Sequence, residues 1–224
     1  MTAAVDRKDS FRTPKLWWIT ALLAIAIALY GWRYAVLGER AYVPNLADSF
    51  KARPWGIFTH TVFGPFALLT GIFQFLPAMR KPGRWRMHRI TGRVYVVSAI
   101  VLATAGLYMS FYSLGGVVTH VGFGFLALFT LATTVQGYLL IRRRKITAHR
   151  QWMLRSYSLI FGAVTLRIWL PLLIAAFHGE FTPAYQIVSW VSWVPNLLIA
   201  ELMIRRGWAP SFKLGGDSNP VIIS

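Results

Sequence analysis

Long apolar stretches separated by short polar ones dominate the pattern of this chain. A helix of about 20 apolar residues crosses a hydrocarbon layer of about 30 Å. Six stretches of this kind cover approximately residues 16–36, 57–77, 94–112, 117–141, 153–176 and 185–204. The connections between them are too short to form a second domain. We therefore expect an all-α integral membrane protein with six transmembrane helices in one domain, residues 16–206, between cytoplasmic tails at 1–15 and 207–224.

The middle of the chain contains an internal repeat. HTVFGPFALLT begins at His60 and HVGFGFLALFT begins at His120, with His, Phe, Gly, Ala, Leu and Thr at the same offsets. Each copy continues through apolar residues to a basic segment with a second His-Arg pair, and these pairs are His88-Arg89 and His149-Arg150. An internal repeat indicates repeated structure. We expect the second to fifth helices, residues 57–176, to form a central four-helix bundle of two tandem hairpins.

The composition agrees with a membrane location and changes how the charge is interpreted. The 224 residues are 56% hydrophobic and 14% charged, with a mean hydropathy of +0.50, which is far more apolar than a soluble domain. Of 24 Lys and Arg residues, 19 lie in the two tails and in the connections after the second and fourth helices. This bias predicts a cell inner membrane protein with both termini cytoplasmic. The net charge of +17 therefore reflects topology and not nucleic-acid binding.

The cysteine count limits the possible chemistry. The chain has no cysteine, which excludes a disulfide framework, a thiolate metal site and covalent haem attachment. Any haem would have to be held by non-covalent ligation.

The expected topology sorts the four repeat histidines into two levels. His60 and His120 lie near the start of helices that run inward, so both belong to the outer level. His88 and His149 lie at the start of helices that run outward, so both belong to the inner level. At about 1.5 Å per residue, the helix from His60 to Pro77 is roughly 26 Å long, which separates the levels by most of the membrane. Two imidazoles that face each other across a bundle can fill both axial positions of a haem iron.

Glycines strengthen this haem hypothesis. Gly64, Gly92 and Gly124 follow three of the histidines by four residues, on the same helix face, where a missing side chain leaves room for a flat macrocycle. Met153 takes this position after His149 and departs from the pattern. The alternatives are that the histidines are interfacial or charged loop residues and that the glycines serve close helix packing.

Sequence motifs identify a resemblance. The run from His60 to about Pro171 is similar to a bacterial membrane-protein family known as domain of unknown function 2306, through HTVFGPFALLTG, MHRITGRVY and AHRQWMLRSY. The family label implies no established activity. More distantly, four histidines on four successive helices resemble the di-haem transmembrane cytochromes b of the ascorbate-reductase and ferric-reductase kind. That resemblance implies one b haem between the first and third histidines, His60 and His120, and another between the second and fourth, His88 and His149, the pairing that topology also gives.

Several cations are candidate partners of haem propionates. On the inner side these are Arg89, Arg93, Arg150 and Arg155, each of which also serves as a topology determinant. Arg167 lies inside the fifth helix at the outer histidine level, where it could bind a propionate or an anionic reductant, or snorkel to the headgroups. His178 lies in an outer loop as a surface residue or a substrate contact. Glu201 and Arg205 have the i, i+4 spacing of an ion pair.

Together these features predict a membrane cytochrome b that moves electrons through two bis-histidine b haems. A quinol or small reductant would be the donor, and a metal ion or redox partner the acceptor. No G-x-G-x-x-G fingerprint is present, so a nucleotide-binding redox domain would be a separate protein. A cofactor-free transporter or assembly scaffold, with histidines relaying protons, is the alternative, and haem handling is a third.

Overall fold

A computed structural model of the protein describes residues 15–76, 79 and 83–207. The expected tails therefore lie almost entirely outside the described residues, as do Lys81 and Pro82 of the connection after the second helix. Within the described ranges the chain is helical and contains no strand. The elements are α1 (Lys15–Leu37), η1 (Gly38–Ala41), η2 (Pro44–Leu46), α2 (Ala47–Lys51), α3 (Pro54–Gln74), α4 (Trp85–Ser110), α5 (Val117–Arg142), α6 (Ile146–Ile160), α7 (Gly162–Ala176), α8 (Phe181–Val191) and α9 (Val194–Arg205).

Six spans of these helices are long and apolar enough to cross a membrane, which confirms the expected fold class. The spans are Trp17–Ala41, Pro54–Gln74, Trp85–Ser110, Val117–Arg142, Ile146–Ala176 and Phe181–Arg205. The third and fifth begin earlier than residues 94 and 153, where the sequence pattern set them. Arginine and lysine are good helix formers, so the helices continue through basic residues beyond the apolar stretches.

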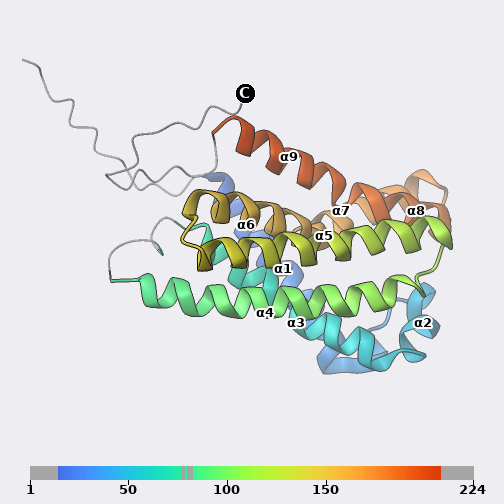
Figure 1. The fold of residues 1–224 in the computed structure, drawn as a ribbon. Coiled ribbons are helices and arrows are strands. Elements are labelled where there is room, and N and C mark those ends of the chain that lie inside the picture. Colours follow the sequence, from blue (N-terminus) through green and yellow to red (C-terminus); the bar gives the residue numbers. More distant parts are fainter. Residues whose placement is uncertain (1–14, 77–78, 80–82, 208–224) are drawn as a thin grey trace, which may run out of the picture.

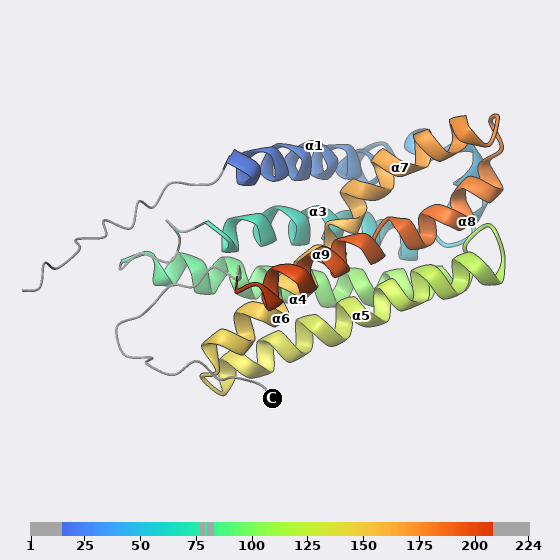
Figure 2. The same cartoon turned by 90° about the horizontal axis from the view of Figure 1, so that it is seen from above.

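A central bundle of four helices organises the molecule. α3 packs on α4, α4 on α5 and α5 on α6, while α1 packs outside α3, and α8 and α9 pack on α5 and α6. Figures 1 and 2 show α1 along one side of this bundle and α9 crossing over another. Gly115 and Gly116, both with positive φ, close the short turn between α4 and α5. The two hairpins predicted from the repeat therefore lie side by side.

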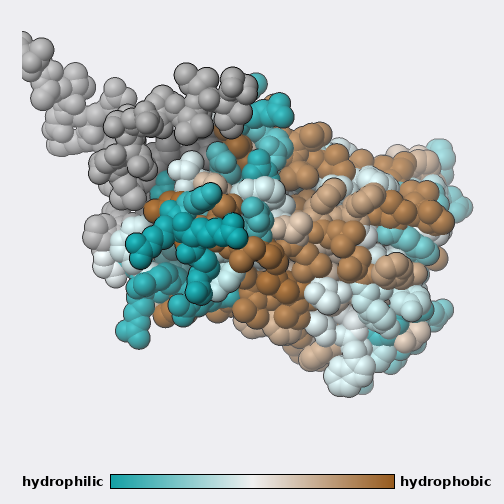
Figure 3. Space-filling view, in the orientation of Figure 1, coloured by the Kyte–Doolittle hydropathy of each residue, from teal (hydrophilic) through white to brown (hydrophobic). Residues whose placement is uncertain are grey.

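The surface has the distribution of a membrane protein. Apolar residues cover the middle of the face shown in Figure 3, and hydrophilic residues gather at the end where α4 and α6 begin. We call this the basic end, because the arginines that follow α3 and α5 lie there, and we call the other the turn end, after the α4–α5 turn. Among exposed large hydrophobic side chains, Val97, Leu128 and Leu198 come from three different helices. A lipid bilayer is the environment that this surface requires.

Hydrogen bonds between buried hydroxyl groups connect the four core helices at mid-bundle. Ser156 Oγ on α6 lies 2.7 Å from Tyr95 Oη on α4 and 2.7 Å from Thr134 Oγ1 on α5. Tyr157 Oη donates to Leu68 O on α3 at 3.2 Å. All of these side chains are buried. Because membrane helices associate through packing and interhelical hydrogen bonds, this cluster fixes how the two hairpins meet.

Gly71 on α3 provides a test of this packing. A Cβ at Gly71 would overlap the Tyr157 ring and lie 2.8 Å from Cε2 of Tyr95. We expect Gly71→Ala to destabilise the protein by about 1–2 kcal/mol, because overpacking outweighs the gain in helix propensity. Thermal unfolding in detergent measures this. Gly64→Ala on the same helix is the control, since its Cβ would meet only Leu102 Cδ1, at 3.5 Å. Equal melting temperatures for the two variants would contradict the packing described.

The helices of two transmembrane spans are interrupted at the same depth, and hydrogen bonds connect the two interruptions. The fifth span breaks between α6 and α7 and the sixth between α8 and α9. Gly162 lies against the second break, since its Cβ would stand 3.4 Å from Ser192 O. The Asn196 amide donates to Ser192 O and to Thr165 Oγ1, both at 3.0 Å, and Thr165 Oγ1 also donates to Ser192 O. The Ser192 carbonyl at the break therefore accepts from two side chains, at a depth where water is not available as a donor.

Candidate functional site

The four repeat histidines lie at the two ends of the core bundle. His60 is in the second turn of α3 and His120 in the first turn of α5, both at the turn end. His88 and His149 are in the first turns of α4 and α6, at the basic end. Figure 1 shows these helix ends at opposite sides of the molecule. The antiparallel order of the helices produces this arrangement.

A cavity of about 260 Å³ occupies the half of the bundle nearer the turn end. Residues of α1 and of α3 to α8 form its walls, and Leu46, Ser49 and Phe50 of η2 and α2 line it as well. Most of the lining is apolar. His60, Arg167 and Tyr185 contribute imidazole, guanidinium and phenol groups. The cavity therefore combines apolar walls with a few polar groups, which is typical of a small-molecule site.

His60 presents its ring to this cavity. A Cβ at Gly106 on α4 would lie 3.6 Å from both Cε1 and Nδ1 of the ring, so the imidazole fits against α4 where no side chain intervenes. His60 is exposed, and it is among the residues that line the cavity. Gly64, one turn later on α3, lines the same cavity. His60 and Gly64, which the sequence pattern groups together, therefore line the same cavity.

His120 does not share that surface. Its ring is half-buried, Nε2 lies 3.0 Å from the carbonyl oxygen of Ser113, and it is not among the cavity-lining residues. A carbonyl oxygen only accepts, so Nε2 carries the proton and Nδ1 the lone pair in this arrangement. Gly124 faces Ser110, since its Cβ would stand 3.5 Å from Ser110 Oγ. The structure thus brings His60, Gly64 and Arg167 together at the cavity and leaves His120 and Gly124 outside its lining.

The His149 ring at the basic end is oriented by a backbone group. Its Nδ1 donates to the carbonyl oxygen of Gly137 on α5 at 2.8 Å. Nε2 therefore carries the lone pair, the state required of a metal ligand or proton acceptor. Met153 explains the departure from the glycine pattern, because its Sδ lies 2.6 Å from where a Cβ on Gly137 would be. The thioether fills the α5–α6 crossing.

His88 contacts α3. In the amide orientation that satisfies both ends of Gln74, its nitrogen lies 2.8 Å from His88 Nδ1 and its oxygen 3.1 Å from the Gly92 amide nitrogen. The Trp85 ring packs edge-on against His88, with centroids 6.2 Å apart. Gln74 therefore fills the space beside Gly92 that the sequence pattern assigned to a macrocycle.

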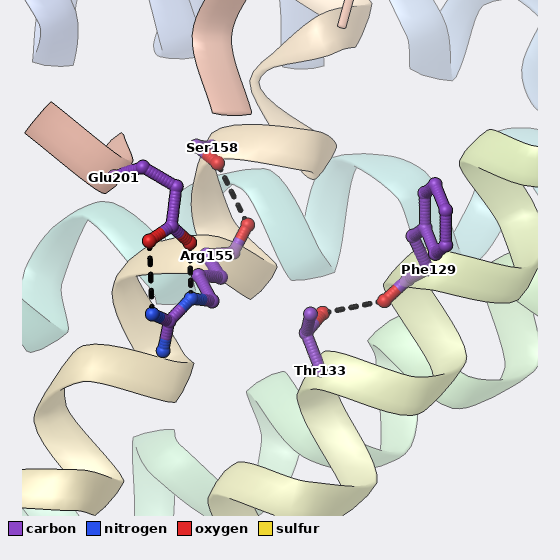
Figure 4. Close-up of polar contacts among 5 residues, drawn as sticks. All are labelled: Phe129, Thr133, Arg155, Ser158 and Glu201. Carbon is purple, nitrogen blue, oxygen red and sulfur yellow. Dashed lines mark hydrogen bonds and ion pairs between the residues drawn. The ribbon is translucent and has the colours of Figure 1, made fainter. Parts of the chain in front are cut away.

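The candidate cations at the basic end have different surroundings. Arg89 and Arg93 are exposed and Arg150 is half-buried. Arg155 forms a bidentate pair with Glu201 on α9, with Nη2 donating to Oε2 at 3.0 Å and Nε donating to Oε1. Figure 4 shows this pair between α6 and α9 beside the Ser158–Arg155 hydrogen bond, and Thr133 donating to Phe129 on α5. The i, i+4 prediction for Glu201 was wrong, because its ion-pair partner is Arg155 and not Arg205.

Arg167 is held inside the bundle by α7 and α1. Its Nη1 donates to the carbonyl oxygen of Ala163 at 2.8 Å, and its guanidinium carbon lies 5.3 Å from the Tyr30 ring centroid. Among the described residues, its buried Nε has no hydrogen-bond partner. His178 is exposed with a φ of 52° in the loop after α7, and it is not among the cavity-lining residues.

Three features of the site escaped sequence reasoning. These are the cavity itself, Tyr185 and the Arg155–Glu201 pair. Glu201 inside an apolar span was the only signal for the pair, because a charge there needs a partner. Among the described residues there is no cluster of three or more His, Cys, Asp or Glu suited to a metal ion. A haem iron needs only two protein ligands.

This geometry defines the class: a six-span membrane protein with a four-helix core and a histidine at one end of each core helix. The family model described as "Predicted membrane protein (DUF2306)" matches residues 57–204, and the chain belongs to that family. No curated protein and no solved structure matches the chain. The resemblance to di-haem cytochromes b stays a prediction.

Proposed function

We propose that this protein transfers electrons across the membrane through two b haems, one between His60 and His120 and one between His88 and His149. The observation that carries the proposal is the cavity of about 260 Å³ onto which His60 opens within a bundle that repeats its histidines at both ends. A bis-histidine haem would supply reversible one-electron chemistry and leave no axial position for oxygen. The donor would be a quinol or a small reductant, and the acceptor a metal ion or a redox partner.

The residues at the turn end fit half of a haem site as they stand. Apolar walls and Gly64 line the space that a flat ring would need, and Arg167 would provide a cation for its carboxylates. His60 already faces this space. His120 would have to turn away from Ser113 to supply the second ligand, since its Nε2 is engaged there.

At the basic end, the orientation of the His149 ring supports the proposal. Metal-bound histidines usually donate their second ring nitrogen to a carbonyl or carboxylate, and His149 Nδ1 donates to Gly137 O. Its Nε2 is thereby prepared as a ligand. His88 would join it on displacement of the Gln74 side chain, which now lies beside it.

The charge distribution supports an orientation in the membrane. Lys and Arg are concentrated after α3 and α5 and in both terminal segments. Because short cytoplasmic loops are enriched in these residues, the basic end would face the cytoplasm of an inner membrane. Electrons would then pass between the cytoplasmic side and the side where His60 and Arg167 lie.

Haem reconstitution tests the proposal. The purified protein is expected to bind added haem and to give a low-spin spectrum with split α bands on reduction. His178→Asn is the matched control, because Asn tolerates the positive φ of this position and His178 does not line the cavity. Folded protein that stays colourless with added haem would contradict the proposal.

A cofactor-free transporter is the second candidate. The paired breaks at Gly162 and Ser192 favour it, because discontinuous helices commonly form transporter sites. The Ser192 carbonyl is already satisfied by Asn196 and Thr165, which indicates a structural junction. Flux driven by a pH gradient in haem-free vesicles would favour this candidate.

A further inference from the structure

The cavity contains a cation that lacks an acidic partner. Among the described residues the ion pairs are Lys51–Glu39 and Arg155–Glu201, and neither involves Arg167. Arg167 Nη1 donates to Ala163 O, and the buried Nε of Arg167 has no hydrogen-bond partner within the described chain. An ionised side chain inside a membrane span is costly and usually pairs with another group or lines a ligand path.

The direction of the side chain excludes simple snorkelling. α7 runs from mid-bundle at Gly162 towards the turn end at Ala176. Ala163, the acceptor for Arg167 Nη1, lies four residues before it and therefore deeper in the bundle. A snorkelling arginine would extend the other way, towards the headgroups. Arg167 instead turns back along its helix and lines the cavity.

A second arginine reinforces the positive charge. Arg33 on α1 donates from Nη2 to Tyr30 Oη at 2.8 Å, and its guanidinium carbon lies 4.0 Å from the centroid of the Tyr30 ring. The same ring is 5.3 Å from the guanidinium carbon of Arg167. Arg33 Nε is likewise buried without a hydrogen-bond partner among the described residues. Arg33 and Arg167 thus approach the same Tyr30 ring, and of the two only Arg167 lines the cavity, so the charge of Arg33 adds to the positive potential behind it.

We propose that Arg167 binds a carboxylate of a largely apolar ligand held in this cavity. The guanidinium fork suits bidentate carboxylate recognition, and the apolar walls, including Leu102, Leu126 and Leu166, suit the remainder of such a ligand. The site deepens the proposed function, because the carboxylate could be a haem propionate. A free fatty acid from the bilayer carries the same chemistry.

Metal-free protoporphyrin IX and its dimethyl ester test the site. They share one ring and differ in their carboxylates, and without iron neither depends on histidine ligation. With the full-length protein in nanodiscs of phosphatidylcholine, titration by porphyrin fluorescence should show the free acid binding at least about tenfold more tightly than the ester, as a charged hydrogen bond of about 1.5 kcal/mol or more requires. Arg167→Gln should abolish this preference, and Arg167→Lys should retain part of it. Arg142→Gln, at the exposed basic end, should leave it unchanged.

The outcomes separate this inference from the proposed function. Equal affinity for acid and ester in the wild type, no binding of either, or a preference that survives Arg167→Gln would overturn the carboxylate site. A preserved preference in protein that never gives a low-spin haem spectrum would uphold the site and reject the haem proposal. Displacement of the porphyrin by oleate would assign the site to free fatty acids. Resistance to oleate would assign it to propionates.

Discussion

His60→Ala is expected to abolish one of the two haem components and leave the other. His60 is the histidine whose ring lines the cavity, so its removal takes away an axial ligand at the turn end without touching His88 or His149. The haem content per chain should fall by about half, because low-spin bis-histidine coordination needs both ligands. Redox titration followed at the α band should show one component in place of two.

Imidazole rescue separates lost ligation from misfolding. Truncation at His60 leaves space next to Gly106, against which the native ring lies. Free imidazole should occupy that space and restore the missing low-spin component. His88→Ala should remove the other low-spin component. It should leave in place the component that depends on His60. If His60→Ala and His88→Ala both leave the spectrum of the wild type unchanged, the assignment of ligands is incorrect.

Glu201→Leu is expected to have the largest effect on stability. Arg155 and Glu201 side chains are 19% and 32% exposed, so the pair is largely withdrawn from water, and it connects α6 to α9. Loss of the carboxylate leaves a guanidinium without its counter-charge beside the Trp152 ring, 4.8 Å from its centroid. The expected cost is about 2–4 kcal/mol, somewhat below that of breaking a fully buried pair. Thermal unfolding in detergent, followed by circular dichroism, measures it.

A double-mutant cycle distinguishes the ion pair from its separate side chains. Arg155→Met with Glu201→Leu should recover most of the lost stability, because replacing both partners removes the uncompensated charge. Arg206→Gln is the control, since Arg206 is an exposed arginine at the end of the same helix and forms no ion pair in the described chain. Strictly additive effects of the Arg155 and Glu201 substitutions would show that the two residues do not stabilise each other.

The hydropathy pattern predicted the six transmembrane spans, for a clear physical reason. Each transmembrane helix must form its backbone hydrogen bonds within itself and present apolar side chains to lipid. Its length and apolarity can therefore be predicted from one continuous stretch of sequence. The predicted starts at residues 94 and 153 were too late, since the helices begin at Trp85 and Ile146. These helices continue beyond the apolar stretches into basic residues. The helix breaks at Gly162 and Ser192 were not predicted from the hydropathy pattern, for a different reason. An average over a window of residues measures apolarity and does not detect an interrupted hydrogen-bond ladder.

The candidate site was predictable only where one residue carried its own signal. Arg167 inside an apolar span is conspicuous because a charge there is costly, and the structure locates it in the cavity. The Arg155–Glu201 pair joins residues 46 positions apart, and the distance depends on how α9 lies on α6. The contact of His120 with Ser113 likewise depends on the course of the α4–α5 turn. Such pairings are set by tertiary packing and not by local pattern.

The haem content of the protein extracted from its native-like membrane tests the central claim most directly. A pyridine haemochromogen assay on purified protein, expressed in cells supplied with haem precursor, gives the ratio of b haem to polypeptide. Two haems per chain are expected for the wild type. A folded, helical preparation with no b haem and no absorption in the visible region would contradict it.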